Sequence, residues 1–338
     1  MTQQPNQTLL LDQDMVKQLL TVSDINQAVD ETFKGYGNDQ IKNPTKVTLD
    51  IGQHDEWPAY DGFVNAMPAY LGTEDVAGLK WVAGIAGERK AAGLPYITGL
   101  IILLDPHLGH YLAVMDGTYI TDMRTGSQTA NTIHYLACDR SHISLGLYGA
   151  GRQAETTLIT LSDYFKIDDL YLWNRNLENA KKLMQKIEDR VTGTIHLVDP
   201  DHPKDASHEE FTVTATAATS PILKAEWFQP GQTIITMGSG PEAEDDLLLK
   251  ADAIFTDHVE QALHRGALSQ LHEQGQFTAD DLTATIGELA LTPAQYVQSD
   301  QLTIIPIVGT GAMDISVAKR AYDKALTQQV GQPFDFKA

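Results

Sequence analysis

A glycine-rich segment in the middle of the chain carries the clearest chemical signal. Residues 149–154 read G-A-G-R-Q-A, the pattern G-x-G-x-x-A, in which glycines permit a tight turn and a close approach of backbone amides to a pyrophosphate. A strand-like run leads into this segment, and an amphipathic helix-like run from about 152 to 165 follows it. The start of such a helix favours an anion. The segment predicts a dinucleotide-binding turn, with a glycine turn that binds no ligand as the alternative.

The end of the next strand-like run bears on which dinucleotide is bound. An acidic residue there holds the ribose 2′-hydroxyl of NAD, whereas an arginine pairs with the 2′-phosphate of NADP. Here the run ends in Asn174 and Arg175, and Asn176 is expected to cap the following helix. The sequence therefore favours NADP(H) over NAD(H). The alternative is that Arg175 is only a solvated charge.

One basic residue in the first part of the chain is a candidate anion ligand. Lys80 lies between Leu79 and Trp81 in a strand-like run, where a buried ammonium is costly unless it meets an anion. A half-exposed strand with Lys80 in solvent is the alternative.

Two kinds of structure must position these residues. From about residue 143, short apolar runs alternate with helical segments, which indicates an α/β fold with a Rossmann-type, doubly wound parallel sheet. The earlier part is typical of an α+β domain. Residues 11–37 read there as one helical stretch, and the runs 46–52, 78–84, 96–105 and 110–117 read as strands, the last two forming a hairpin. The run 302–326 reads as strand, turn and helix, and this helix is expected to pack on the earlier part.

Composition narrows the function classes. With 338 residues the chain is long enough for two domains, and its net charge of −21 opposes binding to nucleic acid or to an anionic membrane surface. The longest apolar run, 97–104, is far shorter than a membrane span, which needs about 20 residues. The N-terminus lacks signal-peptide features. We therefore expect a cytoplasmic protein. The single cysteine, Cys138, is interpreted as a buried, inert thiol. The histidines and acids of 202–210 and 257–260 are interpreted as side chains of solvated loops that bind no metal.

Several segments together resemble the ornithine cyclodeaminase/mu-crystallin family. They extend from about residue 44 to 320, nearly the whole chain, and their combination is specific although each alone is not. The segments are 67–70 (MPAY), 78–82 (GLKWV), 120–126 (ITDMRTG), 149–154 (GAGRQA), 213–217 (VTATA), 286–289 (IGEL) and 309–314 (GTGAMD).

The resemblance implies a Rossmann dinucleotide-binding domain, residues 127–313, and a substrate-binding and dimerisation domain formed by 1–126 with 314–338. It implies hydride transfer at the amine-bearing carbon of a small amino or imino acid, in a homodimer. The residues implied to bind the cofactor are Thr125, Gly149, Ala150, Gly151, Gln153, Ala154, Asn174, Arg175, Thr216, Ala217 and Gly238.

By the same resemblance, Lys80 and Arg124 would bind the substrate carboxylate, and Lys80 would also donate a proton if desolvation lowers its pKa. Lys46 stands where the family usually has Arg, and would be a weaker third ligand. Asp314 is either an acid at the start of the last helix or a catalytic contact to the substrate amine or nicotinamide.

One position bears on the reaction. Cyclodeaminases carry an Asp in the glycine-rich segment after the strand-like run 232–238, and an ungapped match places it on Gly240, which cannot act as a base. Glu242 is the nearby carboxylate that could conceivably replace it. We therefore expect an amino-acid dehydrogenase or ketimine reductase. Two alternatives stay open: an ornithine or lysine cyclodeaminase that recycles its cofactor, and a non-catalytic binder of NADPH and a small ligand.

Overall fold

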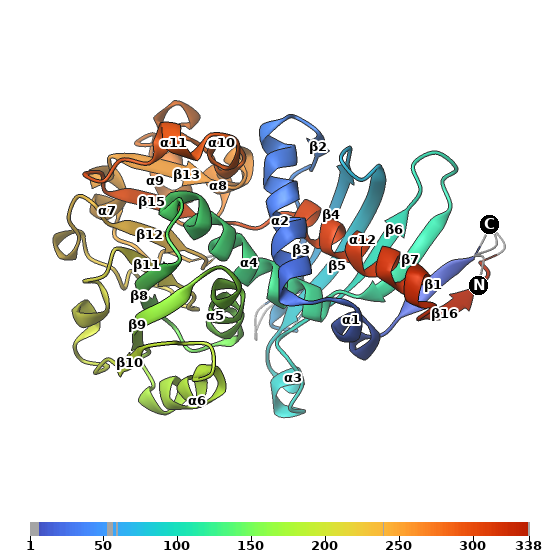
Figure 1. Cartoon of the computed structure of the whole chain (residues 1–338), viewed down its shortest axis with the longest axis horizontal. Coiled ribbons are helices and arrows are strands. Elements are labelled where there is room, and N and C mark those ends of the chain that lie inside the picture. The colour runs from blue at the N-terminus through green and yellow to red at the C-terminus, as the bar shows by residue number, and fades with distance from the viewer. Residues whose placement is uncertain (1–6, 53–56, 59, 239, 337–338) are drawn as a thin grey trace. The chain divides into compact units, whose positions relative to one another are not determined.

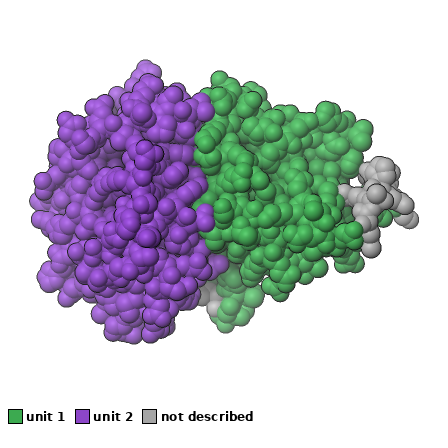
Figure 2. Space-filling view, in the orientation of Figure 1, with its two compact units in different colours: residues 1–124, 310–338 green, residues 125–309 purple. Residues whose placement is uncertain are grey.

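The computed structural model describes residues 7–52, 57–58, 60–238 and 240–336. Two units are distinguished by their internal contacts (Figure 2): unit 1 is Met1–Arg124 with Thr310–Ala338, and unit 2 is Thr125–Gly309. Each is described by itself below. The substrate and cofactor roles assigned to the two parts of the chain from sequence stay predictions. In the described part of the chain, no helix has both the length and the apolar character needed to cross a membrane.

Unit 1 is built on an eight-stranded sheet in which most neighbouring strands are antiparallel (Figure 1). The strand order is β16-β1-β7-β6-β5-β4-β2, and β3 pairs with β4. The strands are β1 (Thr8–Leu11), β2 (Ile41–Lys42), β3 (Val47–Asp50), β4 (Gly62–Leu71), β5 (Val76–Ile85), β6 (Ile97–Leu104), β7 (Tyr111–Asp116) and β16 (Gln332–Phe334). The helices are α1 (Gln13–Leu19), α2 (Val22–Gly37), α3 (Glu88–Ala91) and α12 (Gly311–Gln328).

The last long helix, α12, packs against β4, β5 and β6 and against α2, so the prediction that it returns to the first part of the chain is confirmed. Gly78 permits this close approach, because a β-carbon there would lie 2.9 Å from the side chain of Ile315. Side chains along β5 alternate between the two faces of the sheet: Lys80 and Val82 are buried, whereas Trp81 is 60% exposed. This alternation places Lys80 on the face of the sheet that the helices cover.

Two expectations, one about a helix of unit 1 and one about the cysteine of unit 2, were wrong. Residues 11–37 form two helices, α1 and α2, because Thr21 begins a new helix with a reciprocal capping box: its hydroxyl accepts from the amide of Asp24, whose carboxylate accepts from the Thr21 amide. Cys138 is exposed, since helix α4 (Thr118–Ala137) ends one residue earlier and the chain turns there with a φ of 53°. The cysteine is therefore not a core thiol.

Unit 2 contains the predicted parallel, doubly wound sheet (Figure 1). Its strand order is β10-β9-β8-β11-β12-β15-β13-β14. The strands are β8 (His142–Tyr148), β9 (Lys166–Trp173), β10 (Thr194–Leu197), β11 (Phe211–Thr214), β12 (Thr233–Thr236), β13 (Ala253–Thr256), β14 (Ala284–Thr285) and β15 (Thr303–Pro306). The α-helices that begin in this unit are α5 (Arg152–Tyr164), α6 (Leu177–Ile187), α7 (Asp245–Lys250), α8 (Val259–His264), α9 (Ser269–Glu273), α10 (Ile286–Leu291) and α11 (Pro293–Tyr296).

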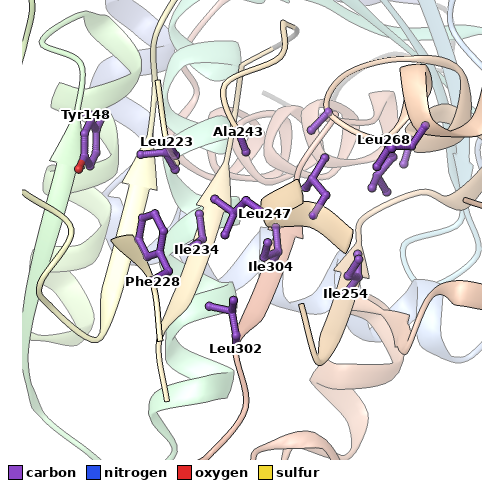
Figure 3. Close-up of a cluster of buried hydrophobic side chains, with 14 of the residues drawn as sticks. Tyr148, Leu223, Phe228, Ile234, Ala243, Leu247, Ile254, Leu268, Leu302 and Ile304 are labelled. Atoms are coloured by element: carbon purple, nitrogen blue, oxygen red, sulfur yellow. The ribbon is translucent and has the colours of Figure 1, made fainter. Parts of the chain in front are cut away.

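The order of these strands determines where a ligand can bind. The chain adds β9 and β10 on one side of β8, then crosses to add β11 and β12 on the other, so the topology switches between β8 and β11. In open parallel sheets, ligands bind beyond the carboxyl ends of the strands at such a point. A hydrophobic cluster packs on one face of this sheet (Figure 3); it includes Leu223, Ile234, Ala243, Leu247 and Ile304.

Candidate active site

A buried cluster of charges lies in unit 1. The ammonium of Lys80, on β5, donates to Oδ2 of Asp314 at 2.6 Å, and Nε of Arg124, on α4, donates to Oδ1 of the same carboxylate at 3.1 Å. The hydroxyl of Thr121 is 3.3 Å from Oδ1. Lys80 and Asp314 are 1% and 0% exposed, and Arg124 is 6% exposed. Three residues expected to act together are thus in direct contact.

Strand β5 and helix α12 position Lys80 and Asp314 in this cluster. Lys80 pairs with Met67 on β4 and Ile101 on β6, so its side chain enters a row that is otherwise apolar and buried. Asp314 lies in the first turn of α12, where the helix dipole favours an acid, but the N-cap is Thr310. Asp314 is therefore an N-terminal-turn acid and also the partner of both cations.

Burial sets the electrostatics of Lys80. Desolvation lowers the pKa of its ammonium from 10.5 to about 7, the carboxylate of Asp314 opposes that shift, and the positive charges of Arg124 and Lys46 add to it. The charge of Lys46, directly before β3, therefore repels the ammonium of Lys80. Lys80, Arg124 and Asp314 thus form one buried network of charged side chains.

The glycine turn of unit 2 has the geometry of a phosphate-binding loop. Gly149, at the end of β8, has a φ of 116°, and a β-carbon there would lie 2.3 Å from the carbonyl oxygen of Ala215. Gly151 is the N-cap of α5, and nothing lies within 4 Å of the place of its missing β-carbon. Ala154 is fully buried, as close packing of helix on sheet requires. The turn thus leaves open space at the start of a 13-residue helix.

A second observation fits a dinucleotide at this turn. Oε1 of Gln153, in the first turn of α5, is buried and has no hydrogen-bond partner among the described residues. A buried polar atom without a partner costs free energy, which a ligand contact would remove. Ala150 lies between the two glycines, and Thr125, on α4, precedes Gly126, whose missing β-carbon would meet the backbone of Thr156 on α5 at 2.5 Å. Ala150 is therefore part of the turn, and Thr125 is next to a residue that packs on α5.

The end of β9 carries the residues expected to read the ribose. Asn176 caps α6, as predicted, by accepting from the amides of Glu178 and Asn179. The side-chain amide of Asn174 donates to the carbonyl of Asn176 at 2.7 Å, and Arg175 is exposed. The Arg175 guanidinium is thus accessible at the carboxyl end of the strand next to β8.

The segments after β11 and β12 are joined by the carboxylate of Glu242. Its Oε1 accepts from the amide and the hydroxyl of Thr216, and its Oε2 accepts from the hydroxyl of Thr214 and the amide of Gly238. The side chain is completely buried. The hypothesis that Glu242 could replace the missing base is not supported, because each of its carboxylate oxygens accepts hydrogen bonds from two donors. Ala217, next to Thr216, is exposed.

Sequence reasoning missed or misplaced some functional candidates. Asp257 was interpreted as part of a solvated loop, but it is 3% exposed and accepts from the amides of Val308 and Gly309 and from the side chain of Gln128. Its position at the end of the buried run 253–256 was an available signal.

Comparisons with known proteins find similar sequences over nearly the whole chain. The model of the ornithine cyclodeaminase/mu-crystallin family matches residues 6–329. An alanine dehydrogenase of Archaeoglobus fulgidus is 34% identical over 98% of this chain and 99% of its own, and a ketimine reductase mu-crystallin of Rattus norvegicus is 29% identical over 84% and 85%.

Solved structures have the same fold over nearly the whole length. An archaeal alanine dehydrogenase dimer with bound NAD superposes with a TM-score of 0.86 at 33% identity, covering 98% of this chain and 99% of the other. A Delta(1)-pyrroline-2-carboxylate reductase of Thermococcus litoralis, in complex with NADH and L-proline, gives a TM-score of 0.85 at 27% identity, covering 96% and 99%.

Proposed function

The chain belongs to the ornithine cyclodeaminase/mu-crystallin family, and from that premise we propose that it is an NAD(P)-dependent amino-acid dehydrogenase or ketimine reductase. Its substrate would be a small amino or imino acid. The relatives reported above, an alanine dehydrogenase, a ketimine reductase and a pyrroline-2-carboxylate reductase, support this reaction class. When bound, the nicotinamide supplies or accepts the hydride at the amine-bearing carbon.

The buried contact of Lys80, Asp314 and Arg124 carries the proposal. Both cations contact Asp314 in a buried cluster, and the substrate carboxylate would bind to these same cations. Arg124 would bind that carboxylate in fork geometry, and Lys46 would add attraction from the edge of the cluster. Lys80, with a pKa of about 7, would hold a proton that it can give to the nitrogen of the reacting amine or imine near neutral pH. Asp314 would keep the ammonium of Lys80 in place.

Two observations oppose cyclodeamination. The position matched to the cyclodeaminase Asp is Gly240, and a β-carbon there would lie 2.4 Å from the carbonyl oxygen of Ala218. No side chain fits without a backbone shift. The neighbouring acid, Glu242, is held by its four donors. An ornithine or lysine cyclodeaminase is therefore the less favoured reading, and a non-catalytic binder has no observation of its own in its favour.

We propose NADP(H) as the preferred cofactor because Arg175 is exposed at the end of β9 and the strand end carries Asn174 in place of an acid. The two structural neighbours described above hold NAD and NADH, so this preference needs its own measurement. Titration with NADPH and NADH separately should give at least a tenfold preference for NADPH, about 1.4 kcal/mol. Arg175→Ala should remove that preference and leave NADH affinity unchanged.

A homodimer is proposed from the uncovered face of the unit 1 sheet. Val47, Ala66, Trp81 and Leu100 are direct cross-strand neighbours on β3, β4, β5 and β6. Val47, Trp81 and Leu100 are each more than half exposed. A row of exposed apolar side chains across four strands is typical of a protein contact surface.

The activity is tested by spectrophotometric assay of NAD(P)H oxidation with a panel of keto acids plus ammonium and of cyclic imino acids. The expected result is net cofactor oxidation with at least one of them. Ammonia release from ornithine or lysine without net cofactor change would instead establish a cyclodeaminase. Cofactor binding without turnover across the panel would establish a binding protein.

A further inference from the structure

We infer that Glu242 is a positioning residue whose carboxylate fixes the two backbone segments that hold the nicotinamide half of the cofactor. The inference rests on the proposed cofactor binding and not on the identity of the substrate. The pyrophosphate turn is at the end of β8, and Arg175, at the end of β9, would read the adenosine ribose. The other half of the dinucleotide therefore extends across the switch point, over the ends of β11 and β12.

The contacts of Glu242 lie at those two strand ends. The Thr216 amide is 2.9 Å and its hydroxyl 2.6 Å from Oε1, while the Thr214 hydroxyl is 2.6 Å and the Gly238 amide 2.7 Å from Oε2. Each oxygen thus receives one backbone N–H and one hydroxyl. This pattern requires a carboxylate, because a side-chain amide has one acceptor oxygen and an NH₂ group that would face donors.

The carboxylate continues the backbone pairing where the strands separate. The amide of Ala215 still donates to Tyr148 on β8, and that of Met237 still donates to Thr214. One residue further along each segment, the amides of Thr216 and Gly238 donate to Glu242 instead. Without the carboxylate of Glu242, the amides of Thr216 and Gly238 would lose their shared acceptor, which links the segments that follow β11 and β12.

Glu242 is itself held firmly. The next residue, Ala243, is 1% exposed within the hydrophobic cluster of Figure 3, and the carbonyl of Glu242 accepts from the amides of Ile222 and Leu223. Gly238 has no room for a side chain, because a β-carbon would lie 2.5 Å from Cδ of Glu242. Glu242 is therefore held in one position by packing and by backbone hydrogen bonds.

A shift of the Thr216 segment would also reach the phosphate turn. The carbonyl of Ala215 lies 2.3 Å from the place of the missing β-carbon of Gly149, so the two segments are in contact at the switch point. The proposed role is thus to fix the geometry of the cofactor site. It is not proton transfer, since the side chain is fully buried and no oxygen is left without a donor.

The test compares Glu242→Gln with wild type by calorimetric titration with NADPH and NADH, kcat at saturating cofactor, and melting temperature. The matched control is Glu244→Gln in the same segment, whose carboxylate accepts a single bond from the amide of Ala225. Thr214→Val removes one of the four donors without changing shape, and it serves if Glu242→Gln does not fold.

For Glu242→Gln we expect the Kd for both cofactors to rise at least tenfold, with kcat at saturation within about threefold of wild type. For Thr214→Val we expect a rise of about two- to fivefold, and for Glu244→Gln no change. Unchanged Kd values in both Glu242→Gln and Thr214→Val would overturn the inference, as would an unchanged Kd with a lost limb in the pH–kcat profile, which would mean acid–base catalysis. If wild type binds neither cofactor, the proposed function fails, and this inference fails with it. Binding without turnover refutes only the proposed enzymatic activity.

Discussion

Replacing Lys80 with Met should remove a pH dependence of stability that this lysine gives the protein. Burial lowers the pKa of Lys80 from 10.5 to about 7, and the side chain is 1% exposed in the native state. Between these two values the unfolded chain binds one more proton than the native protein, so the free energy of unfolding rises with pH by about 1.4 kcal/mol per unit. The contribution is lost as the pH falls towards 7. From about pH 7.5 to about pH 9.5 it amounts to roughly 2.5 kcal/mol.

The measurement is urea unfolding of wild type and Lys80→Met at about pH 7.5, 8.5 and 9.5. Other titrating groups cancel in the difference between the two proteins, and Asp314 keeps Arg124 as its partner in the variant. The stability of wild type relative to the variant should rise over this range by roughly 2.5 kcal/mol. Lys34→Met is the control, because Lys34 is half exposed and pairs with Asp30 on the surface of α2. A difference between wild type and Lys80→Met that does not change with pH would refute the depressed pKa.

Three further outcomes are expected. Arg124→Lys should raise the substrate KM at least tenfold and leave the cofactor Kd unchanged, because a lysine cannot reproduce the guanidinium fork; an unchanged KM in steady-state assays would remove Arg124 from the carboxylate site. Trp81→Glu should convert a dimer into a monomer by light scattering, since Trp81 is 60% exposed in the apolar row; a variant that stays dimeric would place the interface elsewhere. Substrate binding at about pH 8 should take up a proton, because the arriving carboxylate raises the lowered pKa of Lys80; equal binding enthalpies in buffers of different ionisation enthalpy would contradict this.

The sequence predicted those parts of the fold that depend on local pattern. The alternation of apolar runs and amphipathic helices after residue 143 gave the parallel sheet, and the turn at 105–109 gave the hairpin of β6 and β7. The break between α1 and α2 was missed because the apolar pattern continues through it, whereas the capping box at Thr21 depends on side-chain geometry. The exposure of Cys138 was missed for a similar reason, since α4 ends one residue before it.

The candidate site was predictable only where a residue type is rarely found in its sequence context unless it has a specific role. A lysine between Leu79 and Trp81 already indicated a buried anion partner, and the structure identifies a partner in Asp314, 234 positions away. No local pattern could have joined these two residues. The four donors around Glu242 come from strand ends that meet only in the folded sheet, so the sequence around this residue gave no sign of them.

Two acids, Asp314 and Glu242, already have their carboxylate oxygens occupied by donors of the protein. Asp314 is shared by two cations, and Glu242 is surrounded by four neutral donors. Neither is left to bind the second ammonium group that a diamino acid would bring, and Gly240 has no room for another acid. A substrate with one carboxylate and one reacting nitrogen leaves no such charge unpaired. The charge arrangement therefore favours reduction of an imino acid, or the reverse oxidation, over cyclisation of a diamino acid.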